Sequence, residues 1–201
     1  MTAVENDEEI ANAYKAQFNT DNVLVCDAHE YLLNHFHEYD FIWSSPPCQS
    51  HSRMMKGTRH TRRVYPDMSL YQEIVLLKHF FKGKWVVENV VPYYEALMPP
   101  TKKLGRHLFW SNFYISAVDI KSPSNFINNG TVEAANELAD WLGIKYEKPI
   151  YYKGNHCPAQ VLRNCVHPLI GNQVFSCALQ PGGFVFATVP DDLRVDERSR
   201  T

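Results

Sequence analysis

Three short runs of this chain are apolar throughout, where an ordinary half-buried strand would alternate between apolar and polar residues. They cover residues 22–26 (NVLVC), 41–43 (FIW) and 85–87 (WVV). Strands that are buried on both faces carry this unbroken pattern. Helical patterns separate the runs, and strands that alternate with helices are typical of an α/β protein. We therefore predict an α/β fold in which these runs are strands of one sheet.

Helix signals surround these runs. Asp7 is a typical N-cap residue, and Ile10, Tyr14 and Phe18 then recur every four residues, which predicts an amphipathic helix that ends near Asn19. A capping box of Ser69 and Gln72 predicts a helix through Phe81. Further elements are expected at residues 107–115 (a strand), 131–142 (a helix that ends before Gly143) and 171–179 (a helix).

Composition excludes several other classes of protein. The 201 residues are 45% hydrophobic and 21% charged, which excludes disorder, collagen and coiled coil as the main architecture. No apolar run approaches the roughly 20 residues that span a bilayer, and the acidic first ten residues are unlike a signal peptide. Five irregularly spaced cysteines favour a reduced, cytoplasmic setting. The net charge of −2 means that any nucleic-acid site must be a local patch.

A chemically capable residue follows each apolar run. Asp27 follows the first run, Cys48 the second and Glu88 the third. In open α/β sheets, ligands bind outside the carboxyl ends of the strands. A carboxylate, a thiol and a second carboxylate at one sheet edge therefore predict an active site.

Cys48 lies in the segment SSPPCQS. The two prolines fix the backbone angle φ near −65° and lack amide donors, so the turn before the thiol is stiff. A rigid turn that holds a thiol suits a positioned nucleophile. The competing interpretation is a structural core cysteine, but the neighbours are mostly serine and glutamine, whereas a core cysteine usually has apolar neighbours.

The segment from residue 49 to residue 66 carries positive charge and no acid. Its basic residues are Arg53, Lys56, Arg59, Arg62 and Arg63. Long connections of this kind are usually functional, although most charge runs are solvated loops. We expect this segment to neutralise phosphates beside the thiol and to favour the thiolate of Cys48.

The motifs PPCQ at residues 46–49 and ENV at residues 88–90 resemble those of the cytosine-C5 DNA methyltransferases. Three further motifs extend the resemblance: VEND at residues 4–7, GRHLFWSNF at residues 105–113 and GNQV at residues 171–174. Within the family, the sequences GRHLFW at residues 105–110 and LRNCVHP at residues 162–168 are most similar to those of the phage and restriction-modification members. The resemblance implies a Rossmann-like methyltransferase sheet with helices on both faces, together with a small target-recognition segment.

The resemblance also implies S-adenosylmethionine as cofactor and double-stranded DNA as partner. Glu5 would hold the ribose of the cofactor and Asp27 its adenine. The other cofactor-binding residues would be Asn6, Pro47, Asn172 and Val174. The residues that would contact DNA are Gln49, Ser52, Arg53, Lys56, Arg59, Arg62 and Arg63.

In the implied mechanism, the enzyme flips a cytosine out of the duplex, because C5 and C6 are inaccessible within the base stack. The thiolate of Cys48 adds to C6, and C5 then accepts the methyl group. In the final elimination a base removes the C5 proton and the thiol of Cys48 leaves C6. Glu88 would bond N3 and the exocyclic amine, and Arg106 would lie near the target base.

The chain departs from the family at its beginning. Members start with a strand and a glycine-rich turn, F-x-G-x-G, which nothing before Val4 matches. A start placed too far downstream, a split enzyme and a decayed remnant remain open; we favour a truncated or split gene. We expect unpaired strand edges at this place, and a second chain or an upstream segment that supplies the motif.

The expected organisation is a catalytic core over residues 1–114, a short target-recognition region over 115–160, a return to the core over 161–189 and a polar tail over 190–201. The sequence does not decide whether this chain is active alone. Two alternative functions are a transfer-RNA cytosine-C5 methyltransferase and an inactive or partner-dependent subunit of a DNA methyltransferase. A metal site of His156, Cys157, Cys165 and His167 is disfavoured, because the spacing fits no common zinc pattern.

Overall fold

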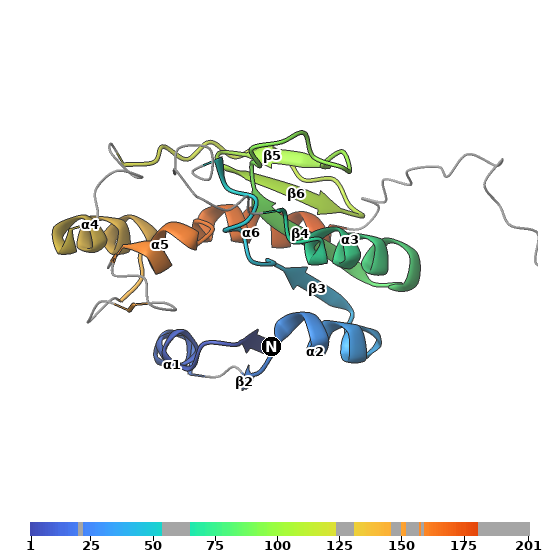
Figure 1. Cartoon of the computed structure of the whole chain (residues 1–201), viewed down its shortest axis with the longest axis horizontal. Coiled ribbons are helices and arrows are strands. Elements are labelled where there is room, and N and C mark those ends of the chain that lie inside the picture. Colours follow the sequence, from blue (N-terminus) through green and yellow to red (C-terminus); the bar gives the residue numbers. More distant parts are fainter. Residues whose placement is uncertain are drawn as a thin grey trace, which may run out of the picture.

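The computed structural model describes residues 1–19, 22–53, 65–123, 131–145, 150–151, 157 and 159–180, and it shows a mixed α/β fold (Figure 1). The N-terminal part contains β1 (Thr2–Glu5), α1 (Glu8–Gln17), β2 (Asn22–Val25) and α2 (Ala28–His35), followed by the short 3₁₀ helix η1 (Phe36–Glu38). β1 and β2 pair in parallel, from Thr2 opposite Asn22 to Glu5 opposite Val25. Asp7 caps α1 as predicted, and its carboxylate accepts hydrogen bonds from the amides of Glu9 and Ile10.

A second sheet has the strand order β3-β4-β6-β5. Its strands are β3 (Phe41–Ser44), β4 (Lys84–Val90), β5 (Lys102–Leu104) and β6 (His107–Ser111). β3 and β4 are parallel, whereas β6 runs antiparallel to both β4 and β5. The strand predicted over residues 107–115 therefore ends at Ser111, four residues early.

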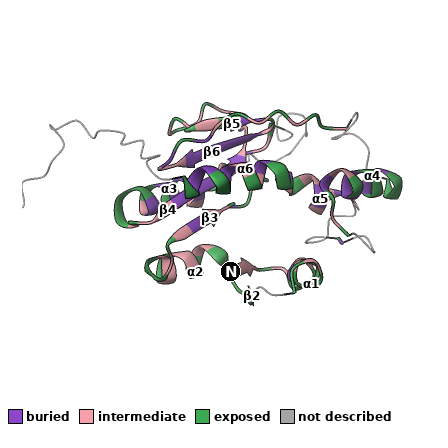
Figure 2. Ribbon diagram, turned by 180° about the vertical axis from the view of Figure 1, so that it is seen from behind, coloured by how far each residue is buried: buried purple, intermediate pink, exposed green. Residues whose placement is uncertain are grey.

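Helices cover both faces of this second sheet. α3 (Ser69–Phe80) packs on one face, in a cluster that includes Trp85 and Val87 of β4. α6 (Pro168–Leu179) packs on the other face, in a cluster that includes Val86. Figure 2 shows β4 as a largely buried strand between these helices. The apolar run of β4 thus serves two cores, which confirms the prediction of a strand buried on both faces.

α4 (Val132–Leu142) and α5 (Gln160–Asn164) form a third, smaller cluster. The hydroxyl of Thr131 accepts a hydrogen bond from the amide of Ala134, which caps α4. Gly143 ends this helix with a φ of +67°, a left-handed conformation that glycine adopts without strain. Both ends of α4 agree with the prediction.

The prediction of a single sheet was wrong for the described residues. β2 pairs with β1 in a two-stranded sheet, and β3 and β4 belong to the other sheet. Among the described strands, none pairs with the edge of β1 that faces away from β2 or with the edge of β3 that faces away from β4. Figures 1 and 2 show β1 and β3 on the two sides of this break. The sequence analysis predicted unpaired strand edges at this place.

Two helix starts also differ from the prediction. Met68, not Ser69, occupies the N-cap position of α3, and the carboxylate of Asp67 accepts the amide of Ser69 at 3.0 Å. α6 begins at Pro168, three residues earlier than expected, because proline suits the first turn of a helix. Nδ1 of His167 accepts the amide of Leu169 at 3.1 Å and caps this helix.

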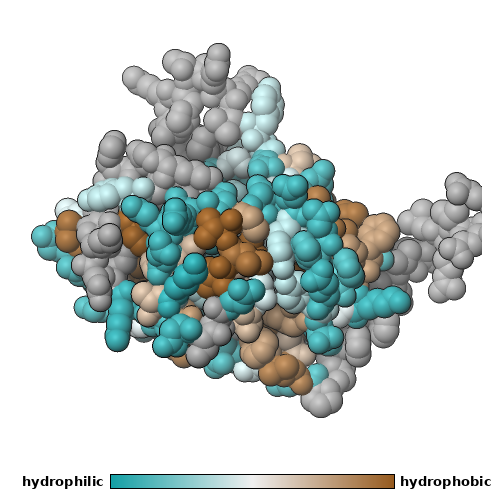
Figure 3. Space-filling view, turned by 90° about the horizontal axis from the view of Figure 1, so that it is seen from below, coloured by the Kyte–Doolittle hydropathy of each residue, from teal (hydrophilic) through white to brown (hydrophobic). Residues whose placement is uncertain are grey.

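The surface beneath β1 and β2 carries apolar groups. Figure 3 shows apolar side chains among polar ones on this face, and Val25 and Leu33 are exposed. All five cysteines are free thiols. No helix in the described ranges is long and apolar enough to cross a membrane.

Candidate active site

Two neighbouring parallel strands bring Cys48 and Glu88 to the same edge of the second sheet. Ser44 at the end of β3 pairs with Val87 of β4, so Glu88 lies beside the turn that follows β3. Asn89 fixes this turn, because its Nδ2 donates a 2.9 Å hydrogen bond to the carbonyl oxygen of Pro46. Asn89 is only 1% exposed, so this hydrogen bond lies in the protein interior. The stiff proline turn predicted from the sequence is therefore held to the neighbouring strand.

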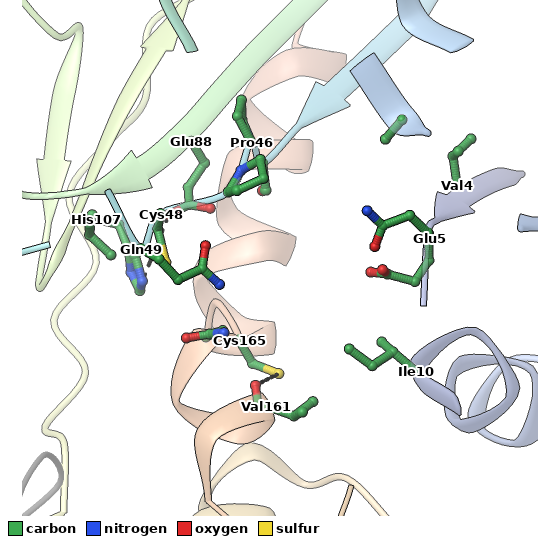
Figure 4. Close-up of a pocket in the computed structure, with 16 residues that line it drawn as sticks. Val4, Glu5, Ile10, Pro46, Cys48, Gln49, Glu88, His107, Val161 and Cys165 are labelled. Atoms are coloured by element: carbon green, nitrogen blue, oxygen red, sulfur yellow. Dashed lines mark hydrogen bonds and ion pairs between the residues drawn. The ribbon is translucent and has the colours of Figure 1, made fainter. Parts of the chain in front are cut away.

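A pocket of about 320 Å³ opens at this edge (Figure 4). Its walls come from β1 and α1, the turn after β3, strands β4 and β6, and α5. The lining residues are Val4, Glu5, Asn6, Ile10, Ala28, Ser45, Pro46, Pro47, Cys48, Gln49, Glu88, Val90, His107, Val161, Asn164 and Cys165. Pockets that hold small ligands typically have volumes of about 300–1,000 Å³. Segments far apart in the sequence thus converge on a space of ligand size.

The thiol of Cys48 is held mainly in its protonated form. Burial raises its pKa, and the nearby carboxylate of Glu88 raises it further, while the guanidinium of Arg106 lowers it. We expected the basic segment to favour the thiolate, but Lys56, Arg59, Arg62 and Arg63 of that segment lie outside the described residues. Among the described groups, Arg106 supplies the charge that stabilises the thiolate.

Glu88 is a buried carboxyl group with an unusual proton affinity. It is 5% exposed, and burial raises its pKa to about 7, against opposing contributions from Ser45 and Arg106. A carboxyl group with this pKa is about half protonated at neutral pH. Glu88 can therefore donate or accept a proton under ordinary conditions.

His107 joins this wall of the pocket, although the sequence analysis did not select it. Nε2 of His107 lies 3.8 Å from Oε1 of Glu88, and both side chains are 7% exposed. Val90 pairs with His107 in the antiparallel ladder, so His107 shares a sheet face with Glu88, two residues before Val90. The signal was present as strand alternation, but it required knowing the register of β4 and β6. Burial, and then Arg106, lowers the pKa of His107 to about 4, so its imidazole is neutral at pH 7.

Arg106 connects the active-site edge to α5. Its Nη2 donates a 2.5 Å hydrogen bond to the carbonyl oxygen of Arg163. Its charge acts on both Cys48 and Glu88, as the pKa shifts of these groups show. The structure thus brings together Cys48, Glu88 and Arg106, the three residues that the resemblance implies as catalytic.

Three of the six candidate cofactor residues line the pocket, and the other three do not. Glu5, Asn6 and Pro47 line the pocket. Oε1 of Glu5 accepts the amide of Asp7 at 2.9 Å, which fixes the orientation of that carboxylate at the start of α1.

The other three candidates lie elsewhere. Asp27 caps α2, where its Oδ1 accepts the amide of Glu30 at 2.9 Å, and its neighbour Ala28 reaches the pocket instead. Asn172 is exposed on α6. Val174 is fully buried in the core between α6 and the second sheet.

Three of the candidate DNA-contacting residues are described. Gln49 lines the pocket, and Ser52 forms an isolated bridge with Pro92. Nε of Arg53 donates to the carbonyl oxygen of Pro92 at 3.4 Å. The remaining four candidates, Lys56, Arg59, Arg62 and Arg63, lie outside the described residues.

The disfavoured metal-binding residues serve other contacts. Nε2 of His167 lies 3.1 Å from the carbonyl oxygen of Trp141, and Sγ of Cys165 lies 3.4 Å from that of Val161. His156 is outside the described residues. Within the described part of the chain, no group of three or more His, Cys, Asp or Glu side chains is placed to hold a metal ion.

Comparisons with known proteins identify part of the chain. No curated protein and no solved structure matches it. A family model does match, over the segment that contains β1 to β4 and therefore both Cys48 and Glu88. Residues 1–93 match the family of C-5 cytosine-specific DNA methylases, which confirms the resemblance seen in the sequence.

Proposed function

We propose that this chain is a DNA (cytosine-5)-methyltransferase that moves a methyl group from S-adenosylmethionine to C5 of a flipped cytosine through a covalent bond to Cys48. The observation that carries the proposal is the convergence of Cys48 and Glu88 on one pocket with Glu5 and Asn6. The family match over residues 1–93 includes all four residues.

Glu88 supplies a proton at the position where the base needs one. When the sulfur of Cys48 adds to C6, negative charge develops on the ring, and a proton donor at N3 stabilises it. The raised pKa of Glu88, about 7, leaves much of the carboxyl protonated at neutral pH. A carboxyl group with an ordinary pKa near 4.5 would be ionised there and unable to donate.

The same proton also favours the nucleophile. The ionised carboxylate of Glu88 raises the pKa of Cys48, so protonation of Glu88 removes this penalty on the thiolate. Arg106 stabilises the thiolate in either state. The arrangement therefore links formation of the thiolate to readiness of the proton donor, and both depend on the absence of bulk water around Glu88.

The pocket suits the proposed cofactor in its polar lining. The carboxylate of Glu5 can accept hydrogen bonds from ribose hydroxyls, and the side-chain amide of Asn6 can donate to them or accept from them. Ile10 offers an apolar surface beside these two residues. S-adenosylmethionine, when bound, supplies the methyl group. Asp27, Asn172 and Val174 remain part of the proposed cofactor site through the resemblance alone.

The rest of the proposal follows the same resemblance. We assign a Rossmann-like catalytic core to residues 1–114, target recognition to 115–160, a return to the core to 161–189 and a tail to 190–201. DNA would lie against Gln49, Ser52, Arg53 and the basic residues that follow. The expected setting is the cytoplasm of a bacterial or phage-infected cell, with a second chain or an upstream segment as the proposed partner.

Transfer of labelled methyl groups from S-adenosylmethionine tests this function, with duplex DNA and transfer RNA offered separately. We expect label on C5 of cytosine in DNA, and its loss in Cys48→Ala. Label on transfer RNA alone would replace the proposed substrate with the rival one. DNA binding without transfer to either substrate would instead support a subunit that is inactive alone.

A further inference from the structure

Hydrogen bonds hold the turn that carries Cys48 on both sides of the thiol. Before the thiol, Nδ2 of Asn89 donates to the carbonyl oxygen of Pro46. After it, the carbonyl oxygen of Cys48 itself accepts the amides of His51 at 3.1 Å and Ser52 at 3.0 Å, which makes one tight turn of this stretch. The position of Cys48 therefore depends on what holds His51.

His51 is fully buried, and it contacts the segment that follows β4. Its carbonyl oxygen accepts the amide of Tyr93 at 3.0 Å, and its Nδ1 lies 2.5 Å from the hydroxyl oxygen of Tyr94. Glu88 belongs to β4 itself. The stretch of chain that supplies the proposed proton donor thus also holds the turn of the proposed nucleophile.

Two tyrosine hydroxyls determine the direction of the hydrogen bond to His51. The amide of Leu97 donates to the hydroxyl of Tyr71 at 3.1 Å, and this hydroxyl donates to that of Tyr94 at 3.4 Å. The proton of Tyr94 can then be donated to Nδ1 of His51. Burial lowers the pKa of His51, against an opposing contribution from Asp67, so its imidazole is neutral at pH 7 and has one nitrogen that accepts.

The second ring nitrogen of His51 adds no further hydrogen bond. Nε2 is buried and has no hydrogen-bond partner among the described residues, although Asp67 acts on the ring electrostatically. Tyr71, by contrast, is packed in the core between α3 and the second sheet. The hydroxyl of Tyr94 therefore links the imidazole to a side chain that the core holds in place.

We propose that Tyr71, Tyr94 and His51 are positioning residues that fix the thiol of Cys48 relative to Glu88. These three described residues do not line the pocket, so they act through the turn and not on a ligand. As a role in catalysis, this inference rests on the proposed function. A displacement of about 1 Å at a reacting group can slow a reaction about a hundredfold, which makes such a link important for rate.

Alkylation by iodoacetamide, followed by mass spectrometry of the peptides, tests the link without any methyl transfer. Tyr94→Phe removes the hydroxyl and keeps the ring. Burial raises the pKa of the half-buried Cys48 thiol, so a released turn should expose it and let it react severalfold faster than in the wild type. Cys177, which is buried on α6, should stay equally slow in both proteins, and this distinguishes a released turn from general unfolding.

A second pair of tyrosines provides the matched control. The hydroxyl oxygens of Tyr31 and Tyr39 lie 2.7 Å apart, and neither residue lines the pocket. Tyr39→Phe removes the same group from a similar hydrogen bond and should leave the labelling rate of Cys48 at the wild-type value.

Two replacements of His51 test which ring nitrogen matters. The side-chain amide of asparagine lies near the position of Nδ1, and that of glutamine lies near the position of Nε2. We expect His51→Asn to keep the labelling rate of Cys48 near the wild-type value, and His51→Gln to match Tyr94→Phe. Equal rates in the two variants, or the reverse order, would overturn the proposal.

Kinetics of methyl transfer distinguish this inference from the proposed function. In an active wild type, Tyr94→Phe should lower kcat about tenfold or more and leave KM for DNA and for S-adenosylmethionine unchanged, and His51→Asn should keep most of the wild-type kcat. The proposal fails if Tyr94→Phe keeps the wild-type kcat or labels Cys48 at the wild-type rate. A wild type that transfers no methyl group, with faster labelling in Tyr94→Phe, would reject the proposed function and support the positioning of the turn.

Discussion

Oε1 of Glu88 lies 3.8 Å from Nε2 of His107, and both groups are buried in one wall of the pocket. Burial raises the pKa of Glu88 to about 7 and lowers that of His107 to about 4. Both shifts favour the neutral forms, a protonated carboxyl and an uncharged imidazole, at slightly acidic pH. Two titratable groups with opposite shifts in one cleft are a feature of functional sites.

Glu88 should make the protein less stable as pH rises. Folding raises its pKa from 4.5 to about 7, so its stabilising contribution is complete below pH 4.5 and is lost as pH rises through 7. The variant Glu88→Gln has no carboxyl group at this position, so its stability should not fall with pH for this reason. Urea unfolding over a pH series should show the wild type losing about 3 kcal/mol relative to the variant across this range.

The control for this measurement is Glu137→Gln, which removes an exposed carboxylate from α4. It should follow the wild type at every pH. Parallel pH profiles for wild type and Glu88→Gln would show that Glu88 has an ordinary pKa, and the proposed role as proton donor at neutral pH would then fail.

His107 should make the protein less stable as pH falls, which is the opposite of the pH dependence that Glu88 causes. Folding lowers its pKa from 6.5 to about 4, so its contribution is complete above pH 6.5 and is lost as pH falls through 4. His107→Asn should therefore resist acid better, gaining about 3 kcal/mol relative to the wild type over this range. The exposed His79→Asn serves as control, and an equal acid sensitivity of all three proteins would exclude a buried neutral imidazole.

Strand positions were the best-predicted part of the fold, but burial on both faces was predicted correctly for β4 and wrongly for β2, whose Asn22 and Val25 are exposed. The runs at residues 22–26, 41–43 and 85–87 all became strands, and Asp7 and Gly143 marked helix ends correctly. The association of strands into sheets was less predictable, since local pattern does not specify which edges pair. The single predicted sheet became two for that reason.

Some residues of the candidate site could likewise be predicted from the sequence, and others could not. Cys48 and Glu88 follow parallel neighbours, so position after a strand was enough to place them together. Asp27 follows a strand of the other sheet, and its carboxylate caps α2. His107 reaches the site through antiparallel register, which no local motif encodes.

Arg106 should contribute to the reactivity of Cys48. Its positive charge lowers the pKa of the thiol, so Arg106→Gln should raise that pKa and slow alkylation by iodoacetamide severalfold near neutral pH. Arg106→Lys keeps the positive charge, so its Cys48 should be alkylated faster than that of Arg106→Gln. Lys103→Gln on the exposed part of β5 is the control, and the exposed Cys26 is an internal reference. Equal rates for Cys48 in all four proteins would contradict the assignment.

The basic segment after Cys48 should determine how salt affects DNA binding. Replacing Arg59, Arg62 and Arg63 with glutamine should reduce the slope of log affinity against log salt by about 0.9 for each phosphate contact removed. A matched control replaces the three arginines near the C-terminus, at positions 194, 198 and 200, and removes the same net charge. The proposed phosphate contacts are absent if both triple variants keep the wild-type slope.

The most direct measurement is the intact mass of the chain after incubation with S-adenosylmethionine and duplex DNA that contains 5-fluorocytosine. Fluorine at C5 blocks the final elimination, so a thiolate that adds to C6 stays attached. The account predicts a covalent adduct on the peptide that contains Cys48, present in Cys26→Ala and absent in Cys48→Ala. The account is contradicted if DNA binds without forming an adduct, or if the adduct persists in Cys48→Ala.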